Sequence, residues 1–168
     1  MKRDNKKHNA GGAKAKEKKD IFQIKDYVPP NVIDQVIPQQ PLKKISVNNI
    51  KLDDMRSVSH MDMWPEVEYN LYDTIKELGK KTYFVGLGSV IRAGMCVANG
   101  DFNLALYPGT KHRNCDLAAI KVIVEEAGGK VTDLFGNEQR YDQDIKGAII
   151  SNSVVHAEVI DVIKNNLE

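Results

Sequence analysis

The sequence has little of what marks several large classes of protein. It has only two cysteines, Cys96 and Cys115, which are too few for a disulfide framework or a zinc site and suit a reducing cytosol. No apolar run is long enough to span a membrane, and the basic N-terminus lacks the apolar stretch of a signal peptide. The net charge of the 168 residues is +1, which does not favour broad nucleic-acid binding. These absences predict a cytoplasmic chain with neither a membrane partner nor a specific nucleic-acid partner.

The charge that is present is spread unevenly. Residues 1–20 contain eight Lys or Arg and three Asp or Glu, with few apolar residues. Four prolines follow within residues 26–41 and favour extended, irregular backbone. The Lys-rich tail lacks interleaved aromatic residues, so a solvated tail is favoured over an RNA-binding element. We therefore predict a basic, proline-containing and partly disordered segment over residues 1–42 and a folded domain over residues 43–168.

From Lys43 onward, short apolar strands alternate with helices. The predicted strands are 55–60, 82–85, 102–107, 130–133 and 148–151, and the predicted helices are 65–78, 89–99, 117–127 and 153–164. This alternation predicts an α/β fold, a layered sandwich with a mixed, largely parallel sheet. Helix 117–127 has scarcely any polar face, which predicts that it is mostly buried between layers. Ser153 is the predicted N-cap of the last helix.

One carboxylate stands where the most apolar helix begins. Asp116 opens that helix, and two glycines close it. A carboxylate at a helix N-terminus can cap free backbone N–H groups, and it can also hold a metal ion against a phosphate. A plain N-cap is the simpler interpretation. Because the helix is too apolar for an exposed surface, we expect Asp116 to face a cleft, where its charge requires a cationic partner.

Two further stretches are candidates for ligand binding. Glycines precede the predicted helix start at Ser89, and they allow close backbone approach to phosphate or sugar oxygens. Arg92, one turn later, is either a planar fork for phosphate or an ordinary surface residue. His60 ends a predicted strand, a position where histidine is more often a loop or core residue than a ligand.

These stretches together resemble the inositol monophosphatase superfamily of Mg²⁺-dependent phosphomonoesterases. Residues 114–130, N-C-D-L-A-A-I-K-V-I-V-E-E-A-G-G-K, are similar to its W-D-x-A-A…E-A-G-G signature. The resemblance implies that Asp116 is a ligand of a Mg²⁺ cofactor. Cys115 stands where the superfamily usually has Trp, and Ile120 stands where Gly is common. Both departures concern packing around the carboxylate rather than the carboxylate itself.

Within the superfamily, the sequence looks most like the 3′(2′),5′-bisphosphate nucleotidases. G-S-V-I-R at residues 88–92 resembles their G-S-x-x-K turn, and S-V-S-H at residues 57–60 resembles their S-R-S-H segment. Gly109 occupies the position at which inositol-specific members carry a Glu. The resemblance therefore favours a more phosphate-rich substrate than inositol phosphate. The substrate-binding residues that it implies are His60, Gly88, Ser89 and Arg92.

The superfamily takes most of its metal ligands from an upstream Glu-Glu pair and a D-P-[IL]-D-G-T loop, and residues 1–113 contain neither motif. The resemblance thus implies the substrate-side, C-terminal half of a phosphatase that uses metal-activated water. Its substrate would be a 3′(2′),5′-bisphosphonucleotide or an inositol or sugar phosphate. We identify no catalytic residue in this half, and we expect the isolated chain to be inactive. The alternative is a truncated or non-catalytic binding or interaction domain.

The expected partners are a small phosphorylated metabolite and either a complementary N-terminal half or a second copy of the chain. We also expect Asp116 to face a cleft shared with the turn at residues 88–92. Helices that follow parallel strands begin at the same edge of the sheet, so both helix starts should converge there.

Overall fold

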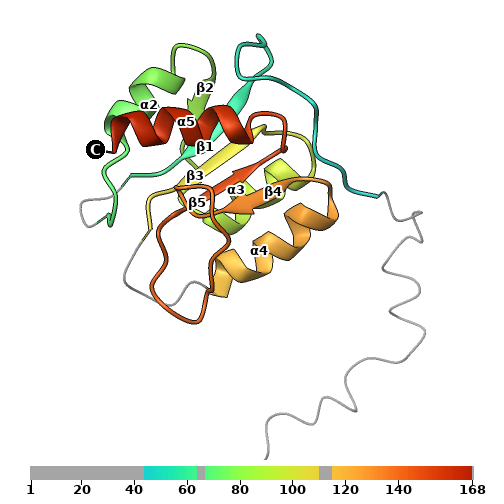
Figure 1. Cartoon of the computed structure of the whole chain (residues 1–168). Helices are drawn as coiled ribbons and strands as arrows, with labels where there is room; N and C mark the ends of the chain where they lie inside the picture. The colour runs from blue at the N-terminus through green and yellow to red at the C-terminus, as the bar shows by residue number, and fades with distance from the viewer. Residues whose placement is uncertain (1–43, 64–66, 110–114, 168) are drawn as a thin grey trace, which may run out of the picture. The chain divides into compact units, whose positions relative to one another are not determined.

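The structure, a computed structural model, describes residues 44–63, 67–109 and 115–167 (Figure 1). The chain divides into two units, Met1–Leu42 and Lys43–Glu168, and the described residues all belong to the second unit. The predicted disordered segment, 1–42, lies outside the described residues. No helix in the described ranges is long and apolar enough to cross a membrane.

Five strands form one mixed sheet in the described part of the chain. The strands are β1 (Val58–Met61), β2 (Tyr83–Val85), β3 (Leu104–Tyr107), β4 (Lys130–Thr132) and β5 (Ala148–Ser151). Their order is β2-β1-β3-β5-β4, with β1 parallel to both β2 and β3 and β5 antiparallel to both β3 and β4. The predicted α/β fold is confirmed, and its parallel part is the half of the sheet built around β1.

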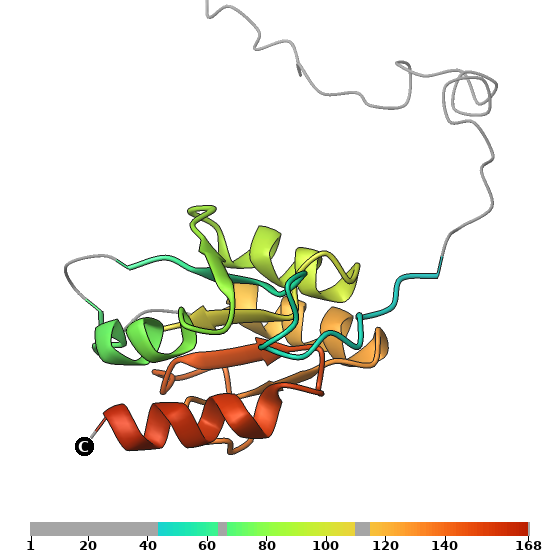
Figure 2. The ribbon, with the colours of Figure 1, turned by 90° about the horizontal axis from the view of Figure 1, so that it is seen from above.

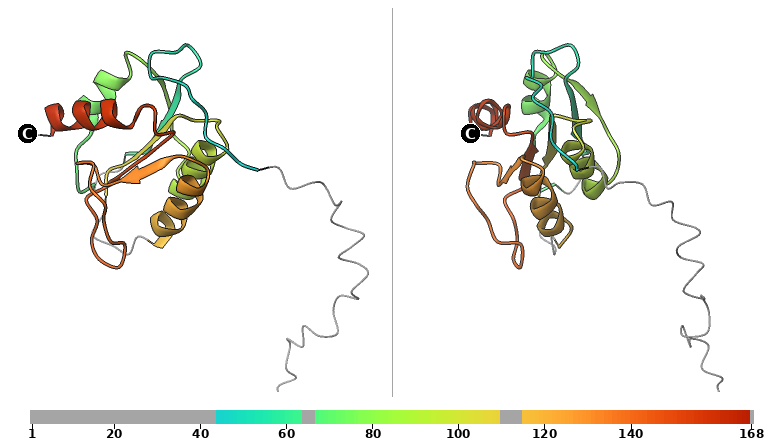
Figure 3. Two further views of the ribbon diagram at one scale, coloured as in Figure 1. Left: turned by 45° about the vertical axis from the view of Figure 1, so that its right-hand side comes forward. Right: turned by 90° about the vertical axis from the view of Figure 1, so that its right-hand side faces the viewer.

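The helices form two layers, one on each face of the sheet (Figures 2 and 3). They are α2 (Tyr72–Leu78), α3 (Val90–Ala98), α4 (Cys115–Glu126) and α5 (His156–Asn166). Helices α2 and α5 pack together on one face, and α3 and α4 pack together on the other. Alternate residues of a strand point to opposite faces, so β3 sends Leu104 and Leu106 into the α2·α5 core and Ala105 into the α3·α4 core.

Helices α3 and α4 run in the same direction and touch closely. A Cβ atom at Gly94 would lie 2.3 Å from Cγ2 of Ile120, so the absence of a side chain lets the helices approach. Both helices end against one segment: Val47 N donates to the carbonyl of Ala127, and Asn48 Nδ2 donates to the carbonyl of Gly100. Their starting ends therefore also lie at one common end of the layer.

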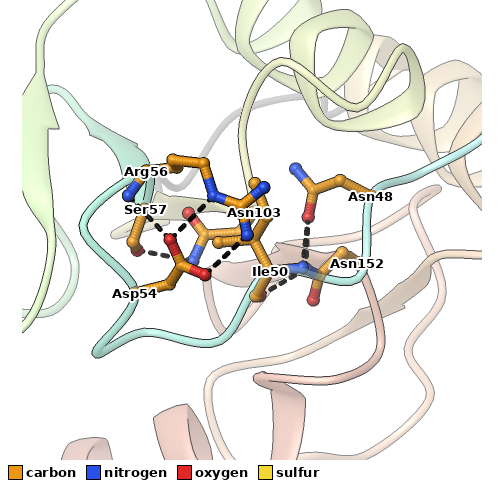
Figure 4. Close-up of polar contacts among 7 residues, drawn as sticks. All are labelled: Asn48, Ile50, Asp54, Arg56, Ser57, Asn103 and Asn152. Carbon is orange, nitrogen blue, oxygen red and sulfur yellow. Dashed lines mark hydrogen bonds and ion pairs between the residues drawn. The ribbon is translucent and has the colours of Figure 1, made fainter.

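The segment before β1 is tied to the sheet by amide side chains (Figure 4). Asn152 Nδ2 donates to Asn48 Oδ1 at 2.7 Å and to the carbonyl of Ile50 at 2.8 Å. Asn103 Nδ2 donates to Ser57 Oγ at 2.8 Å. These contacts join residues about 50 to 100 positions apart and fix the entry to β1.

Three local expectations were wrong. Helix α2 begins at Tyr72, several residues later than predicted, because Glu68 N and Tyr69 N donate to the carbonyls of Gly109 and Pro108 instead of to a helical turn. The start of the predicted helix, residues 65 and 66, lies outside the described residues.

Ser153 does not cap α5. Its φ of 72° is left-handed, and its hydroxyl donates to the carbonyl of Gly128. Helix α5 starts at His156 after Val155, whose backbone N–H donates to Asn152 Oδ1.

Helix α4 is not mostly buried. Leu117, Ile120 and Val124 are buried against the sheet and α3, but Val122 is 63% exposed. The exposure of Val122 is therefore not explained by packing within the described residues.

Candidate active site

A cavity of about 170 Å³ opens where β1 and β3 end and α3 begins. Side chains and backbone of all three elements line it. Its polar and glycine lining is His60, Asp62, Gly88, Ser89 and Tyr107, and its apolar lining is Val90, Ala105, Leu106 and Ile150. The carboxyl ends of parallel strands are the usual place for a ligand site in such sheets. Three of the predicted binding residues, His60, Gly88 and Ser89, are thus brought together.

The start of α3 is built to present backbone N–H groups. Gly88 has a φ of +65°, a conformation that a side chain disfavours, although the space beside its Cα is open. Ser89 is extended, and its hydroxyl accepts the backbone N–H of Arg92 at 3.3 Å as the N-cap. The earlier N–H groups of a helix have no intrahelical acceptor and carry the positive end of the helix dipole. This end of α3 therefore favours an anion or an oxygen-rich ligand.

His60 is a buried side chain in the wall of the cavity. The residue is 3% exposed, and its Nε2 lies 3.2 Å from Oδ2 of Asp62. Burial lowers the pKa of His60, while the Asp62 carboxylate works in the opposite direction. The backbone of Val85 also raises the pKa of His60, and Nδ1 has no hydrogen-bond partner among the described residues. Burial therefore favours the neutral imidazole of His60, and the nearby Asp62 carboxylate favours the protonated one.

Asp116 lies in the first turn of α4 and is exposed. The Cys115 thiol donates to its Oδ1 at 3.6 Å. The contact between Gly94 of α3 and Ile120 of α4 fixes how the two helices are aligned. Ser89 comes five residues before Gly94, and Asp116 comes four residues before Ile120. Because the helices are parallel, Ser89 and Asp116 lie at the same end of the pair. Asp116 and Arg92 are not among the residues that line the cavity, and both residues are exposed.

Asp62 was missed from the sequence although it lines the cavity. It follows His60 by two positions, the spacing that returns a side chain to the same side of an extended chain. Period-two alternation after a strand was the signal that could have found it.

The serines of the S-V-S-H segment have a structural role in this chain. Ser57 Oγ donates to Thr82 Oγ1 at 2.7 Å, and Ser59 Oγ lies 2.9 Å from the same atom. Asn103 completes the cluster through both serines, and all four residues are buried. Buried hydroxyls need such partners, so this network fixes β1 against β2 and the residues before β3. Only His60 of the segment lines the cavity.

Gly109 is locked in place by a close backbone contact. Its φ is +84°, and a Cβ there would lie 2.7 Å from the backbone N of Gly147. Gly147 is equally confined, since its own Cβ would lie 2.5 Å from the carbonyl oxygen of Tyr107. A side chain at position 109 would therefore require the loop before β5 to move.

The described residues fit one ligand of a Mg²⁺ ion and not a complete site. Among them, no group of three or more His, Cys, Asp and Glu is arranged to hold a metal ion. The exposed carboxylate of Asp116 is a hard oxygen donor of the kind that Mg²⁺ accepts. The other ligands would have to come from water, substrate or another part of the protein.

Comparison with known proteins shows the family of this chain. A sequence model described as the inositol monophosphatase family matches residues 30–168, most of the chain. The chain belongs to the inositol monophosphatase family. The resemblance seen in the sequence is therefore confirmed at the level of the family.

Curated relatives match over shorter stretches. A bifunctional NADP phosphatase/NAD kinase of Methanococcus maripaludis is 34% identical over 98 residues, which are 55% of this chain and 17% of that protein. An uncharacterized 22 kDa protein of Leptospira biflexa is 40% identical over 52 residues, 31% of this chain and 26% of that protein. The chain thus spans a small part of the curated relatives it matches.

Solved structures share the fold. An IMPase of Thermotoga maritima is 26% identical with a TM-score of 0.60, covering 73% of this chain and 46% of that one. An IMPase/NADP phosphatase complexed with Mg²⁺ and phosphate is 24% identical with a TM-score of 0.60, covering 73% of this chain and 44% of that one. The chain therefore corresponds to less than half of either solved chain.

Proposed function

We propose that this chain forms the substrate-side half of a Mg²⁺-dependent phosphomonoesterase that acts on a small phosphorylated metabolite. The observation that best supports the proposal is the cavity at the start of α3, which joins His60, Gly88 and Ser89 at the same end of the helix pair as Asp116. Family membership supports a phosphatase, and the solved relative with Mg²⁺ and phosphate supports the metal.

Each residue has a distinct part in the proposed site. The N-terminal N–H groups of α3 bind phosphate or sugar oxygens, with Gly88 and Ser89 holding the turn open to the ligand. His60 positions a polar substrate group through an imidazole that Asp62 orients. Arg92 adds positive charge one turn further along. Asp116 is one ligand of the Mg²⁺ ion, which when bound neutralises phosphate charge and lowers the pKa of its water.

The geometry at Gly109 bears on the substrate. At the position where inositol-specific relatives of the superfamily carry a Glu, a side chain is excluded by the backbone of Gly147. We infer that a phosphorylated nucleotide suits the site better than inositol phosphate or a sugar phosphate. A 3′(2′),5′-bisphosphonucleotide and a 2′-phosphorylated dinucleotide are the substrates to test first, the second because one relative is an NADP phosphatase.

We also infer that the protein acts in the cytoplasm. Cys96 and Cys115 are both free thiols in the structure, a state that a reducing compartment maintains.

The test is Mg²⁺-dependent phosphate release from adenosine 3′,5′-bisphosphate, NADP, inositol phosphate and fructose bisphosphate. We expect little or no turnover by residues 1–168 alone, because one carboxylate holds Mg²⁺ weakly. With the complementary half supplied, Mg²⁺-dependent turnover should appear, and Asp116→Asn should abolish it. Asp101→Asn, which removes an exposed carboxylate at the other end of α3, is the matched control and should retain activity. Robust hydrolysis by the isolated chain that survives Asp116→Asn would refute the proposal.

A second candidate is a non-catalytic binding domain. It is favoured by the absence of a complete metal-ligand group among the described residues. Binding of the same nucleotides without turnover, even with the complementary half present, would support this alternative.

A further inference from the structure

Asp62 is a carboxylate in the wall of the cavity at the start of α3. It follows β1 directly, and its side chain is 27% exposed. Its Oδ2 lies 3.2 Å from Nε2 of His60, so one carboxylate oxygen is engaged with the imidazole. Within the described part of the chain, Oδ1 accepts no hydrogen bond. The second oxygen can therefore accept one from a ligand in the cavity.

Gly86 leaves room for this carboxylate. It follows β2, and the parallel pairing of β1 with β2 places both strand ends at one edge of the sheet. A Cβ atom at Gly86 would lie 2.9 Å from Oδ1 of Asp62. A side chain at position 86 would therefore displace the carboxylate from its place in the cavity.

The polar lining of the cavity favours charges of opposite sign at two places. The N-terminus of α3, at Gly88 and Ser89, attracts an anion. Asp62 repels one, and no Lys or Arg of the described ranges forms an ion pair with it. A carboxylate accepts hydrogen bonds and donates none. Beside Asp62, a ligand must therefore present a neutral hydrogen-bond donor such as a hydroxyl group.

The size of the cavity limits how far this donor can be from the anion. Its volume of about 170 Å³ is well below the roughly 300 to 1,000 Å³ of pockets that enclose drug-sized ligands. The helix start and Asp62 line this one small space, so a single sugar ring can contact both. The apolar side chains of Val90, Leu106 and Ile150 suit the carbon-bearing face of such a ring.

We propose that Asp62 binds a hydroxyl group next to the substrate phosphate and so selects sugar phosphates whose neighbouring hydroxyl is free. The inference rests on the proposed function and narrows its substrate class. Adenosine 3′,5′-bisphosphate, with a free 2′-hydroxyl, and NADP, with a free 3′-hydroxyl beside its 2′-phosphate, both belong to this class. A second phosphate in place of the hydroxyl is disfavoured, because two anions would oppose each other.

A metal ion fits Asp62 less well than a hydroxyl group. His60 already engages one oxygen of the carboxylate, and Mg²⁺ prefers oxygen ligands to the nitrogen that His60 offers. No third His, Cys, Asp or Glu joins these two in a metal-binding group among the described residues.

The first experiment compares adenosine 3′,5′-bisphosphate with its 2′-deoxy analogue as ligands of the full 168-residue chain, by NMR titration without Mg²⁺. The unmodified chain should bind the ribonucleotide at least about tenfold more tightly, because a hydrogen bond to a charged acceptor contributes that much. In Asp62→Ala the preference should fall to about twofold or less. Asp161→Ala removes an exposed carboxylate of α5 and is the matched control, which should keep the full preference.

Inorganic phosphate is the second probe. Its affinity in Asp62→Ala should not fall, and should rise by up to about threefold, because a like charge leaves the cavity. A lost preference for the ribonucleotide together with retained phosphate binding distinguishes a hydroxyl contact from general damage to the site.

Gly86→Ala tests the same contact without removing the carboxylate. Because its Cβ displaces Oδ1 of Asp62, the preference for the ribonucleotide should again fall to about twofold or less. Gly86 is exposed, so the fold should tolerate the change, which circular dichroism and the melting temperature check. This variant also decides the question if Asp62→Ala does not fold.

His60→Gln separates a direct contact from one made through the imidazole. It should weaken both nucleotides by a similar factor and leave their ratio unchanged. A preference lost equally in His60→Gln and Asp62→Ala would mean that Asp62 acts only by orienting His60, and the proposal would be wrong.

Three other results would overturn the proposal. They are equal binding of the two nucleotides by the unmodified chain, an equal loss of both in Asp62→Ala, and a loss of phosphate affinity in Asp62→Ala. The second would place the hydrogen-bond donor on the base, and the third would mean that Asp62 supports the anion site.

The two proposals fail separately. A ribonucleotide preference that depends on Asp62, without phosphate release from any substrate, would keep the selectivity and reject the enzymatic function. Turnover that is lost in Asp116→Asn but equal for the two nucleotides would keep the function and reject the role of Asp62.

Discussion

The two helix layers of this domain cover opposite faces of one sheet but have different outer surfaces. Helix α5 has the pattern of an ordinary surface helix: Val159 and Ile163 are buried, and Glu158, Asp161 and Lys164 face water. Helix α4 is buried on one side, and its exposed residues include the uncharged Cys115, Ala119 and Val122 as well as acidic residues at both ends. The α2·α5 layer has charged side chains on its outer helix surface, whereas the α3·α4 layer exposes the large apolar side chains of Ile91 and Val122. The candidate site lies at the end of the α3·α4 layer where both helices begin.

The largest effect is expected inside the α3·α4 layer. Gly94→Val would place side-chain atoms into Ile120, which already lies within 2.3 Å of a Cβ at that position. The helices would have to separate, and we expect a loss of about 3 kcal/mol in the free energy of unfolding. Urea denaturation measures it. Ala157→Val, at an exposed position of α5, is the control and should change stability by less than about 0.5 kcal/mol. Equal losses of stability in Gly94→Val and Ala157→Val would mean that Gly94 is no more closely packed than an exposed position of α5.

The next effect concerns pH and the α2·α5 layer. His156 is 3% exposed and bridges two strands, with Nδ1 2.8 Å from Ser151 Oγ and Nε2 3.0 Å from Thr132 Oγ1. The Thr132 hydroxyl donates to the carbonyl of Asp133, so it accepts from Nε2–H, and Ser151 donates to Nδ1. This network is complete for the neutral ring. Burial, with a smaller contribution from Lys130, lowers the pKa of His156 to about 4.

Because the unfolded chain binds this proton near pH 6.5 and the folded chain only near pH 4, stability should fall as the pH drops from 6.5 to 4. The loss should reach about 2 kcal/mol at pH 5. The measurement is the urea midpoint as a function of pH, compared with that of His156→Gln. The difference between the two curves gives the contribution of His156 to the pH dependence, separate from that of the carboxylates. Parallel curves would show that His156 titrates normally.

A smaller effect is expected at the polar cluster between β1 and β2. Thr82→Val keeps the shape of the side chain but removes the oxygen that both Ser57 and Ser59 contact. Leaving buried hydroxyls without this partner should cost about 1 to 2 kcal/mol of stability. Tyr72→Phe, which removes a hydroxyl from a residue that is 64% exposed on α2, is the control. If Thr82→Val proved as harmless as Tyr72→Phe in chemical denaturation, the cluster would not hold the strands together.

Local sequence signals predicted helices and strands well where contacts between neighbouring residues determine their bounds. Helix α3 lies between Ser89 and Asn99, as the glycine turn before it indicated, and β5 has the predicted bounds. The signals failed where distant residues compete. Ser153 is a good cap in isolation, but its hydroxyl bonds the carbonyl of Gly128, 25 residues away. The start of the helix predicted at residues 65–78 is likewise replaced by contacts with Pro108 and Gly109.

The candidate site was predictable in part for the same reason. The glycine turn before Ser89 and the carboxylate of Asp116 each occupy a helix start that the sequence marks, and the parallel helix pair sets them at one end of a layer. Asp62 was not singled out, because its one signal, the two-residue spacing from His60, becomes informative only once His60 is placed in the site. The exposed side of α4 could not be foreseen either. An apolar helix predicts a covering layer, but not whether the described chain supplies it.

The smallest effect is the one that most sharpens the comparison of the layers. In the isolated chain, Val122→Glu should change the free energy of unfolding by less than about 0.5 kcal/mol, because Val122 is 63% exposed and Glu has the higher helix propensity. Val154→Glu should behave the same way. A large loss of stability in the isolated chain would mean that Val122 already packs against this chain, and that the α3·α4 layer is as complete as the α2·α5 layer.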